Sequence, residues 1–128
     1  IGKAIENSEI VLSAGAAGAQ LLPFDVLKEY GKKCRIVADI NAIPPLGVEG
    51  LKSKADKGEI LPNVFGIGAL AIGKLKNKVE VELIKRAAEE LRGIFDYKIA
   101  YEIAKKAILE KLKGKKGSET ESEKHWLP

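Results

Sequence analysis

With 128 residues, 45% hydrophobic and 31% charged, the chain is long enough to bury a core and too short for more than one ordinary domain. Its 22 Lys and Arg residues exceed its 18 Asp and Glu residues by only four, and aromatic residues make up 5%, so we expect no nucleic-acid partner. No apolar run approaches the ~20 residues of a membrane span. The single cysteine, Cys34, lies in an apolar run, which favours a packed core thiol and a cytoplasmic protein.

The first candidate strand, residues 9–13 (E-I-V-L-S), leads into a loop of small residues, S-A-G-A-A-G-A. A strand followed by such a loop lets backbone N–H groups approach a ligand closely. The spacing of Gly15 and Gly18 lacks the first glycine of a dinucleotide fingerprint. Two interpretations stay open: a loop that lies against a cofactor, and a plain tight turn after a strand.

The next segments alternate between helix and strand patterns. Residues 21–30 predict a short amphipathic helix with Pro23 in its first turn, and residues 34–38 (C-R-I-V-A) predict a second strand parallel to the first. Residues 52–58 predict a polar surface loop, and residues 64–70 a third strand whose glycines allow close approach of another backbone or a ligand.

Residues 38–50 (A-D-I-N-A-I-P-P-L-G-V-E-G) directly follow the second predicted strand. In an open α/β sheet, ligands bind just past the carboxyl ends of the strands. The stretch combines polar side chains with two prolines that restrict its path. It is therefore the first candidate for a functional site.

Two long amphipathic helices are predicted after the third strand. The first covers residues 75–92 and ends at Gly93, and the second begins after an N-cap at Asp96. We expect their apolar stripes to cover the sheet; the stripes are Leu75, Val79, Leu83, Ala87 and Leu91, then Ile99, Ala100, Ile103, Ala104, Ala107, Ile108 and Leu112. From Gly114 the composition becomes polar, so we expect a folded part at residues 1–113 and a flexible tail at residues 114–128. With His125 as the one histidine, we expect no metal site.

Three blocks carry a family resemblance: S-A-G-A-A-G-A-Q-L-L-P at residues 13–23, V-A-D-I-N-A-I-P-P-L-G-V-E-G at residues 37–50, and F-G-I-G-A-L-A-I-G-K-L-K at residues 65–76. In order and spacing they resemble the carboxy-terminal half of the NADP-dependent methylene-tetrahydromethanopterin dehydrogenases, including those that accept methylene-tetrahydrofolate. The resemblance implies a Rossmann-type nucleotide-binding domain. It also implies hydride transfer between a methylene-tetrahydropterin and NADP in one-carbon metabolism, with no metal.

By position, the resemblance implies roles for individual residues. It implies that Ser13, Ala14, Gly15 and Ala16 bind the cofactor along the nicotinamide and its ribose. Asn41 and Ala42 would lie beside the carboxamide of the nicotinamide, and Gly68 and Ala69 would form a nearby wall of the cofactor site. Lys76 is the catalytic candidate, because a lysine facing the pterin could orient it and tune the charge near the reacting carbon. A solvated cation at the start of a helix is the alternative for Lys76. We expect Asp39 to brace its turn through backbone N–H groups.

The combined expectation is an α/β fold: a partial Rossmann-type parallel sheet of about three strands, flanking helices and two long carboxy-terminal helices. The phosphate-binding glycine loop and a substrate domain are missing from the sequence, so we expect an inactive fragment that needs an amino-terminal domain of the same protein. We also expect a homo-oligomer and, from the Lys- and Glu-rich composition without Met, a thermophilic source. Three alternatives stay open: a non-catalytic nucleotide- or pterin-binding module, a dehydrogenase of the methylene-tetrahydrofolate or shikimate type, and a structural role through the long helices.

Overall fold

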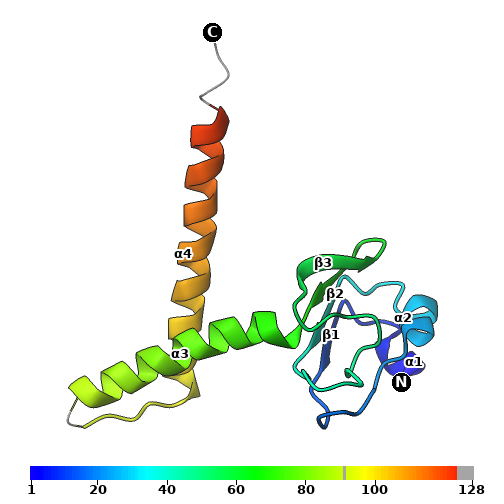
Figure 1. Cartoon of the computed structure of the whole chain (residues 1–128), viewed down its shortest axis with the longest axis horizontal. Coiled ribbons are helices and arrows are strands. Elements are labelled where there is room, and N and C mark those ends of the chain that lie inside the picture. Colours follow the sequence, from blue (N-terminus) through cyan, green and yellow to red (C-terminus); the bar gives the residue numbers. More distant parts are fainter. Residues whose placement is uncertain (91, 124–128) are drawn as a thin grey trace. The chain divides into compact units, whose positions relative to one another are not determined.

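The computed structural model describes the backbone of residues 1–90 and 92–123 and the side chains of residues 1–90 and 92–114. The chain is an α/β protein in which short strands and helices come first and two long helices follow (Figure 1). It divides into two compact units, Ile1–Lys74 and Leu75–Pro128. The elements in order are α1 (Gly2–Ile5), β1 (Ile10–Ser13), α2 (Phe24–Tyr30), β2 (Ile36–Asp39), β3 (Asp56–Leu61), β4 (Val64–Ile67), α3 (Ala69–Glu89) and α4 (Tyr97–Glu123).

The sheet has the strand order β1-β2-β4-β3. The strands β1, β2 and β4 are parallel, which confirms the three predicted parallel strands. In this register Ser13 pairs with Asp39 and Val37 pairs with Gly66. Since parallel strands run in one direction, β1, β2 and β4 all end at the same edge of the sheet.

A fourth strand, β3, was not predicted. It pairs antiparallel with β4 at the edge of the sheet, so the prediction of a polar loop over residues 52–58 is wrong from Asp56 onward. Its sequence, D-K-G-E-I-L, lacks the apolar alternation of a half-buried strand, and charged side chains are common on exposed edge strands. Two register shifts in the pairing with β4 and a positive φ of 65° at Lys57 also make this strand irregular.

The core of the first unit lies on one face of the sheet. Val37 and Val64 come from that face, Leu27 from α2, and Val48 and Leu51 from the segment that follows β2. Burial of a side chain such as Leu27 stabilises a fold by about 1.5–3 kcal/mol. The remaining core residues are Ile5, Leu22 and Cys34. The stretch 38–50 is therefore anchored to the core through Val48, while residues 42–45 within it are exposed.

The long helices have different ends from those predicted. α3 begins at Ala69 instead of residue 75 and ends at Glu89, and the last residues of the predicted third strand belong to α3. The predicted N-cap of α4 is confirmed, because Asp96 Oδ1 accepts the N–H groups of Lys98 (3.0 Å) and Ile99 (3.3 Å). α4 continues through Glu123, so residues 114–123 of the expected tail are helical, and His125 lies outside the described residues.

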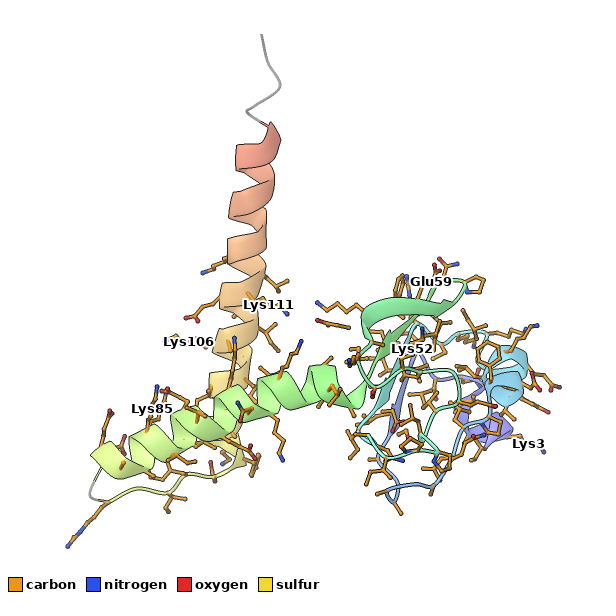
Figure 2. All side chains as sticks on the ribbon, viewed as in Figure 1. Lys3, Lys52, Glu59, Lys85, Lys106 and Lys111 are labelled. Carbon is orange, nitrogen blue, oxygen red and sulfur yellow. The ribbon has the colours of Figure 1, made fainter. Side chains whose placement is uncertain are left out.

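The expectation that both apolar stripes cover the sheet stays a prediction, because the sheet and most of the two helices belong to different units. Among the described stripe positions Val79 and Ile103 are buried, six are half-buried and Ala87, Ile108 and Leu112 are exposed, and Leu91 lies outside the described residues. Charged side chains extend along both helices, among them Lys85 and Lys106 (Figure 2). The periodicity identified an apolar face correctly but could not identify what covers it, since that depends on distant residues.

Candidate functional site

The predicted cofactor-binding residues all lie at or just after the ends of β1, β2 and β4. Ser13 ends β1 and residues 14–16 follow it, residues 41–42 follow β2, and Gly68 and Ala69, the first residue of α3, follow β4. Because these strands end at one edge of the sheet, the structure brings the three groups to that edge. Lys76, in contrast, belongs to the second unit of the chain.

Asp39 organises the loop after β2. Its carboxylate is buried, Oδ1 accepts the N–H of Asn41 (3.0 Å) and Oδ2 accepts the N–H of Val48 (3.1 Å). The first bond closes an Asx turn, a local motif in which an aspartate binds the backbone two residues on. The second ties the far end of the loop to the same carboxylate. The expectation that Asp39 braces this turn is confirmed.

Asn41 continues the same pattern. It is buried, its Oδ1 accepts the N–H of Ile43 (2.9 Å) and its Nδ2 donates to the carbonyl of Pro45 (3.2 Å). The peptide bond between Pro44 and Pro45 is cis. An amide side chain has two donor hydrogens and two acceptor lone pairs. These two bonds use one hydrogen and one lone pair, so Asn41 keeps one donor hydrogen and one acceptor lone pair for a ligand. Its neighbour Ala42 is exposed.

Ser13 lies beside this brace with an unused hydroxyl. Its side chain is buried, and Oγ has no hydrogen-bond partner in the structure. A Cβ atom added at Gly47 would overlap Ser13 Oγ and would lie 2.7 Å from Asp39 Oδ1, so these three residues are in close contact. Burying a hydroxyl without a partner costs about 1–3 kcal/mol, and such a group is available to a ligand. Gly47 was not among the predicted site residues, because its close neighbours are distant in sequence.

The loop after β2 is also fixed to the segment before α2. The carbonyl of Gly47 accepts the N–H groups of Leu21 (2.8 Å) and Leu22 (2.9 Å). At the first turn of α2, Phe24 donates its N–H to Glu49 Oε2 (2.8 Å), which satisfies a backbone group that the helix leaves unpaired. Glu49 is a second residue that the sequence alone did not indicate. The loop is thus held from both sides.

The small-residue loop after β1 is open to solvent. Ala14, Gly15 and Ala16 are exposed, and Gly18 has a φ of 74°, a left-handed conformation that favours glycine. α2 starts only at Phe24, so the loop does not lead directly into a helix. An exposed backbone with small side chains is compatible with both interpretations of this loop.

Gly68 has a packing role at the end of β4. Its N–H donates to the carbonyl of Ala55 (2.8 Å), and a Cβ at this position would overlap the carbonyl oxygens of Lys52 and Ser53. Close approach of two backbones therefore explains a glycine here without any ligand. Ala69, the first residue of α3, is half-buried.

Lys76 lies about two turns inside α3, because the helix begins at Ala69. The alternative of a solvated cation at a helix start is therefore wrong about the helix start but right about the solvent. The Lys76 side chain is 71% exposed, and its Nζ lies 3.3 Å from Glu80 Oε1, one turn further along the helix. Exposed pairs of this kind contribute at most about 0.5 kcal/mol, so the lysine can leave its partner at little cost.

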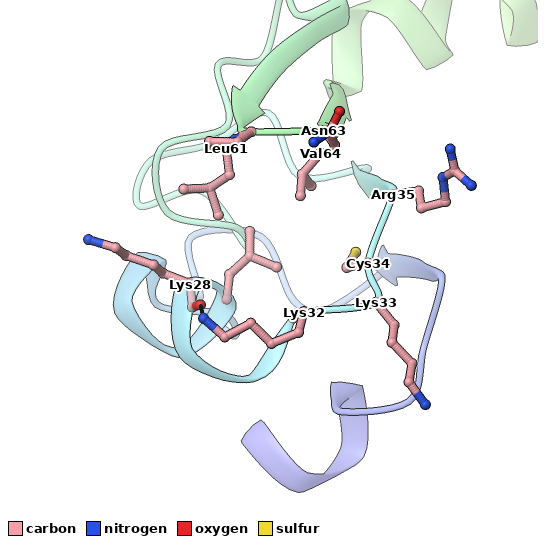
Figure 3. A pocket seen from close by; sticks show the side chains of 11 residues that line it. Lys28, Lys32, Lys33, Cys34, Arg35, Leu61, Asn63 and Val64 are labelled. Carbon is pink, nitrogen blue, oxygen red and sulfur yellow. Dashed lines mark hydrogen bonds between the residues drawn. The ribbon is translucent and has the colours of Figure 1, made fainter.

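A separate hollow of about 490 Å³ lies near the amino ends of β2 and β4 (Figure 3). Leu27, Leu61 and Val64 contribute apolar surface, and Lys32 Nζ donates to the carbonyl of Lys28 (2.9 Å). Figure 3 shows the side chains of Lys33 and Arg35 extending away from this hollow. Cys34 also lines this hollow. Burial raises the pKa of its thiol, and the hydrogen bond that Sγ donates to the carbonyl of Ile36 (3.4 Å) reverses part of that rise. The hollow therefore lacks polar groups that converge as they do at the carboxyl edge.

Among residues 1–90 and 92–123 no three His, Cys, Asp or Glu side chains come together as metal ligands would. Within the same residues, no helix combines the length and the apolar character needed to cross a membrane.

Two curated proteins of Methylorubrum extorquens are similar to this chain, whereas no family model matches it. "Bifunctional protein MdtA" is 38% identical over 103 residues, which cover 80% of this chain and 35% of that protein. "NAD(P)-dependent methylenetetrahydromethanopterin dehydrogenase" is 33% identical over 103 residues, which cover 79% of this chain and 34% of that protein. The similarity agrees with the resemblance of the three sequence blocks. The chain spans about a third of the length of the curated relatives it matches.

Proposed function

We propose that this chain is part of an oxidoreductase that transfers a hydride between methylene-tetrahydromethanopterin, or methylene-tetrahydrofolate, and NADP in one-carbon metabolism. The observation that carries the proposal is the turn braced by Asp39 at the carboxyl edge of the parallel strands. It is supported by the similarity of four-fifths of the chain to two proteins, one of which is named for this dehydrogenase activity.

The residues at this edge fit a nicotinamide cofactor. The buried Ser13 hydroxyl lacks a partner and can bond to the carboxamide or to a ribose hydroxyl. Asn41 keeps one donor and one acceptor for the carboxamide, and the exposed backbone of residues 14–16 allows close approach. NADP, when bound, would supply the carbon that accepts the hydride.

The task of the protein in such a reaction is positioning. Hydride transfer needs the two carbons within about 3–3.5 Å of each other, and small displacements are costly. Asp39 and Asn41 together hold four hydrogen bonds within residues 39–48, so this part of the pocket is rigid before any ligand arrives. Ala42, Gly68 and Ala69 would then complete the wall around the nicotinamide.

Lys76 would act on the pterin rather than on the cofactor. Its exposed, weakly paired ammonium group is available to pair with a substrate carboxylate or ring carbonyl. In the longest polypeptide that the gene encodes, Lys76→Ala should lower kcat/KM for the tetrahydropterin about 100-fold. The matched control is Lys85→Ala, an exposed lysine of the same helix, which should leave the rate unchanged. Equal rates for both variants would favour the non-catalytic binding module.

The activity assay itself compares two proteins. The longest polypeptide that the gene encodes should reduce NADP in the presence of the methylene-tetrahydropterin, whereas residues 1–128 alone should not. The reason is that a phosphate-binding loop and a substrate domain would come from an amino-terminal part of the same protein. Turnover by residues 1–128 alone would contradict the expectation of an inactive fragment. Absence of turnover with both pterins in the longer polypeptide would contradict the proposed reaction. Sedimentation of the longer polypeptide tests the proposed homo-oligomer.

A further inference from the structure

One face of α3 connects two groups of predicted site residues. Side chains three or four positions apart lie on the same face of a helix. Ala69, Gly73 and Asn77 therefore share a face, and Lys76, three residues after Gly73, lies on it as well. Ala69 belongs to the proposed nicotinamide wall, and Lys76 is the residue proposed to act on the pterin. Gly73 lies between them along the helix, and the proposed function so far gives it no role.

Packing does not explain a glycine at position 73. A Cβ atom added there would meet no atom of the described residues within 4 Å, and the position lies inside a helix. Glycine is, after proline, the residue least favourable inside a helix. Gly68 differs, because a Cβ atom there would overlap the carbonyl oxygens of Lys52 and Ser53. Alanine would thus fit at position 73 and would favour the helix, so the glycine indicates that something else uses this space.

The geometry of the helix indicates which ligand would use the space. A rise of about 1.5 Å per residue places Gly73 about 6 Å beyond Ala69 along the axis, and Lys76 about 10 Å beyond it. Hydride transfer needs the reacting carbons of the substrate and the nicotinamide within about 3–3.5 Å of each other. A tetrahydropterin that meets the nicotinamide beside Ala69 and also pairs with Lys76 therefore crosses the helix at Gly73. Because glycine has no Cβ atom, a flat ring can lie directly against the helix backbone there.

We propose that Gly73 makes room for the ring system of the tetrahydropterin and that Asn77 hydrogen-bonds to the polar edge of that ring. Asn77 is exposed and lies about one turn beyond Gly73 on the same face. The amino and carbonyl groups of a pterin edge are a donor and an acceptor, and an amide side chain offers one of each in return. These roles rest on the proposed hydride transfer and name the part of α3 that would hold its substrate.

The first test compares Gly73→Ala with a matched control, Gly114→Ala, in the longest polypeptide that the gene encodes. Gly114 lies inside α4, where an added Cβ atom also meets no atom of the described residues within 4 Å. The methyl group at position 73 should raise the KM for the tetrahydropterin at least about 10-fold, because it holds the ring away from the helix. The KM for NADP should be unchanged, and Gly114→Ala should change neither constant. Calorimetric titration with the tetrahydropterin in the absence of NADP should show the same loss of affinity without turnover.

The second test measures stability, for which the opposite sign is expected. In urea unfolding of residues 1–128, Gly73→Ala and Gly114→Ala should both raise the midpoint, because alanine favours a helix more than glycine does. A gain in stability together with a loss of substrate affinity separates a ligand site from a packing position. A lower midpoint for Gly73→Ala would mean that another part of the chain occupies the space, and it would overturn the proposal.

Asn77→Ala tests the same face without changing a glycine, and it should raise the KM for the tetrahydropterin about 10-fold through the lost hydrogen bonds. An unchanged KM in Gly73→Ala would overturn the role of the glycine, and an unchanged KM in Asn77→Ala would overturn that of the amide. A lower kcat of Gly73→Ala with both KM values unchanged would identify a joint in α3 rather than a ligand site. Absence of turnover in the unsubstituted polypeptide would instead overturn the proposed reaction, and both roles with it.

Discussion

Replacement of Asp39 tests whether its carboxylate holds the loop after β2. In Asp39→Asn one oxygen remains as an acceptor, while the new NH₂ group faces a backbone N–H, so one of the two bonds to Asn41 and Val48 is lost. In Asp39→Ala both are lost. A hydrogen bond to a charged group contributes about 1.5–3 kcal/mol. We therefore expect losses in the free energy of unfolding of about 1.5–3 kcal/mol for Asp39→Asn and about 3–6 kcal/mol for Asp39→Ala.

The measurement is urea unfolding of residues 1–128 followed by far-UV circular dichroism. A lower midpoint with an unchanged slope reports lost stability rather than a changed unfolded state. Small domains have about 5–15 kcal/mol in total, so Asp39→Ala should remove a large share. The control, Glu29→Gln, neutralises an exposed carboxylate of α2 and should change the stability by less than about 0.5 kcal/mol.

Two results would refute this account of Asp39. A loss below about 1 kcal/mol for Asp39→Ala would mean that water replaces both bonds and that the carboxylate does not brace the turn. A larger loss in the free energy of unfolding for Asp39→Asn than for Asp39→Ala would mean that the amide is repelled by its surroundings. That repulsion would then cost more free energy than the two hydrogen bonds contribute.

Three further outcomes follow from the neighbouring contacts and from Cys34. Ser13→Ala should raise the free energy of unfolding by about 1 kcal/mol in the same assay, because it removes a buried hydroxyl without a partner; a loss would reveal a bond to Oγ. Gly47→Ala should destabilise by about 1–3 kcal/mol, and the penalty should fall by at least about 0.5 kcal/mol in the Ser13→Ala background, whereas strict additivity would contradict their contact. Burial raises the pKa of the Cys34 thiol above its ordinary 9.0 in the folded state. At a pH between the ordinary and the raised pKa, the folded state therefore binds more protons than the unfolded state. Stability should therefore be constant below the ordinary pKa and fall as the pH rises through the raised value, and Cys34→Ala should abolish this part of the decline.

The features that sequence could predict are those that depend on nearby residues. The N-cap at Asp96 and the brace at Asp39 both use side chains that bind backbone groups two or three residues on. The strands β1 and β2 and the helix α2 are likewise short segments with clear apolar patterns, and their predicted bounds differ from the observed ones by no more than a few residues.

The features that sequence could not predict depend on distant residues. β3 pairs with β4 at an exposed edge, where neither burial nor alternation is required. α3 begins directly after Gly68, which lies close to the carbonyls of Lys52 and Ser53, a contact that no local pattern specifies. The need for glycine at position 47 arises in the same way, from contact with Ser13 and Asp39, the last residues of β1 and β2.

The loop after β2, residues 39–48, is a candidate wall of the site that is held by bonds within the first unit of the chain. All four side-chain hydrogen bonds of Asp39 and Asn41 end within residues 39–48, and Leu21 and Leu22 anchor the same loop through Gly47. This wall is complete within the chain, so its stability can be measured on residues 1–128 alone. A variant of Asp39 should therefore have the same effect on stability in residues 1–128 as in the longest polypeptide that the gene encodes.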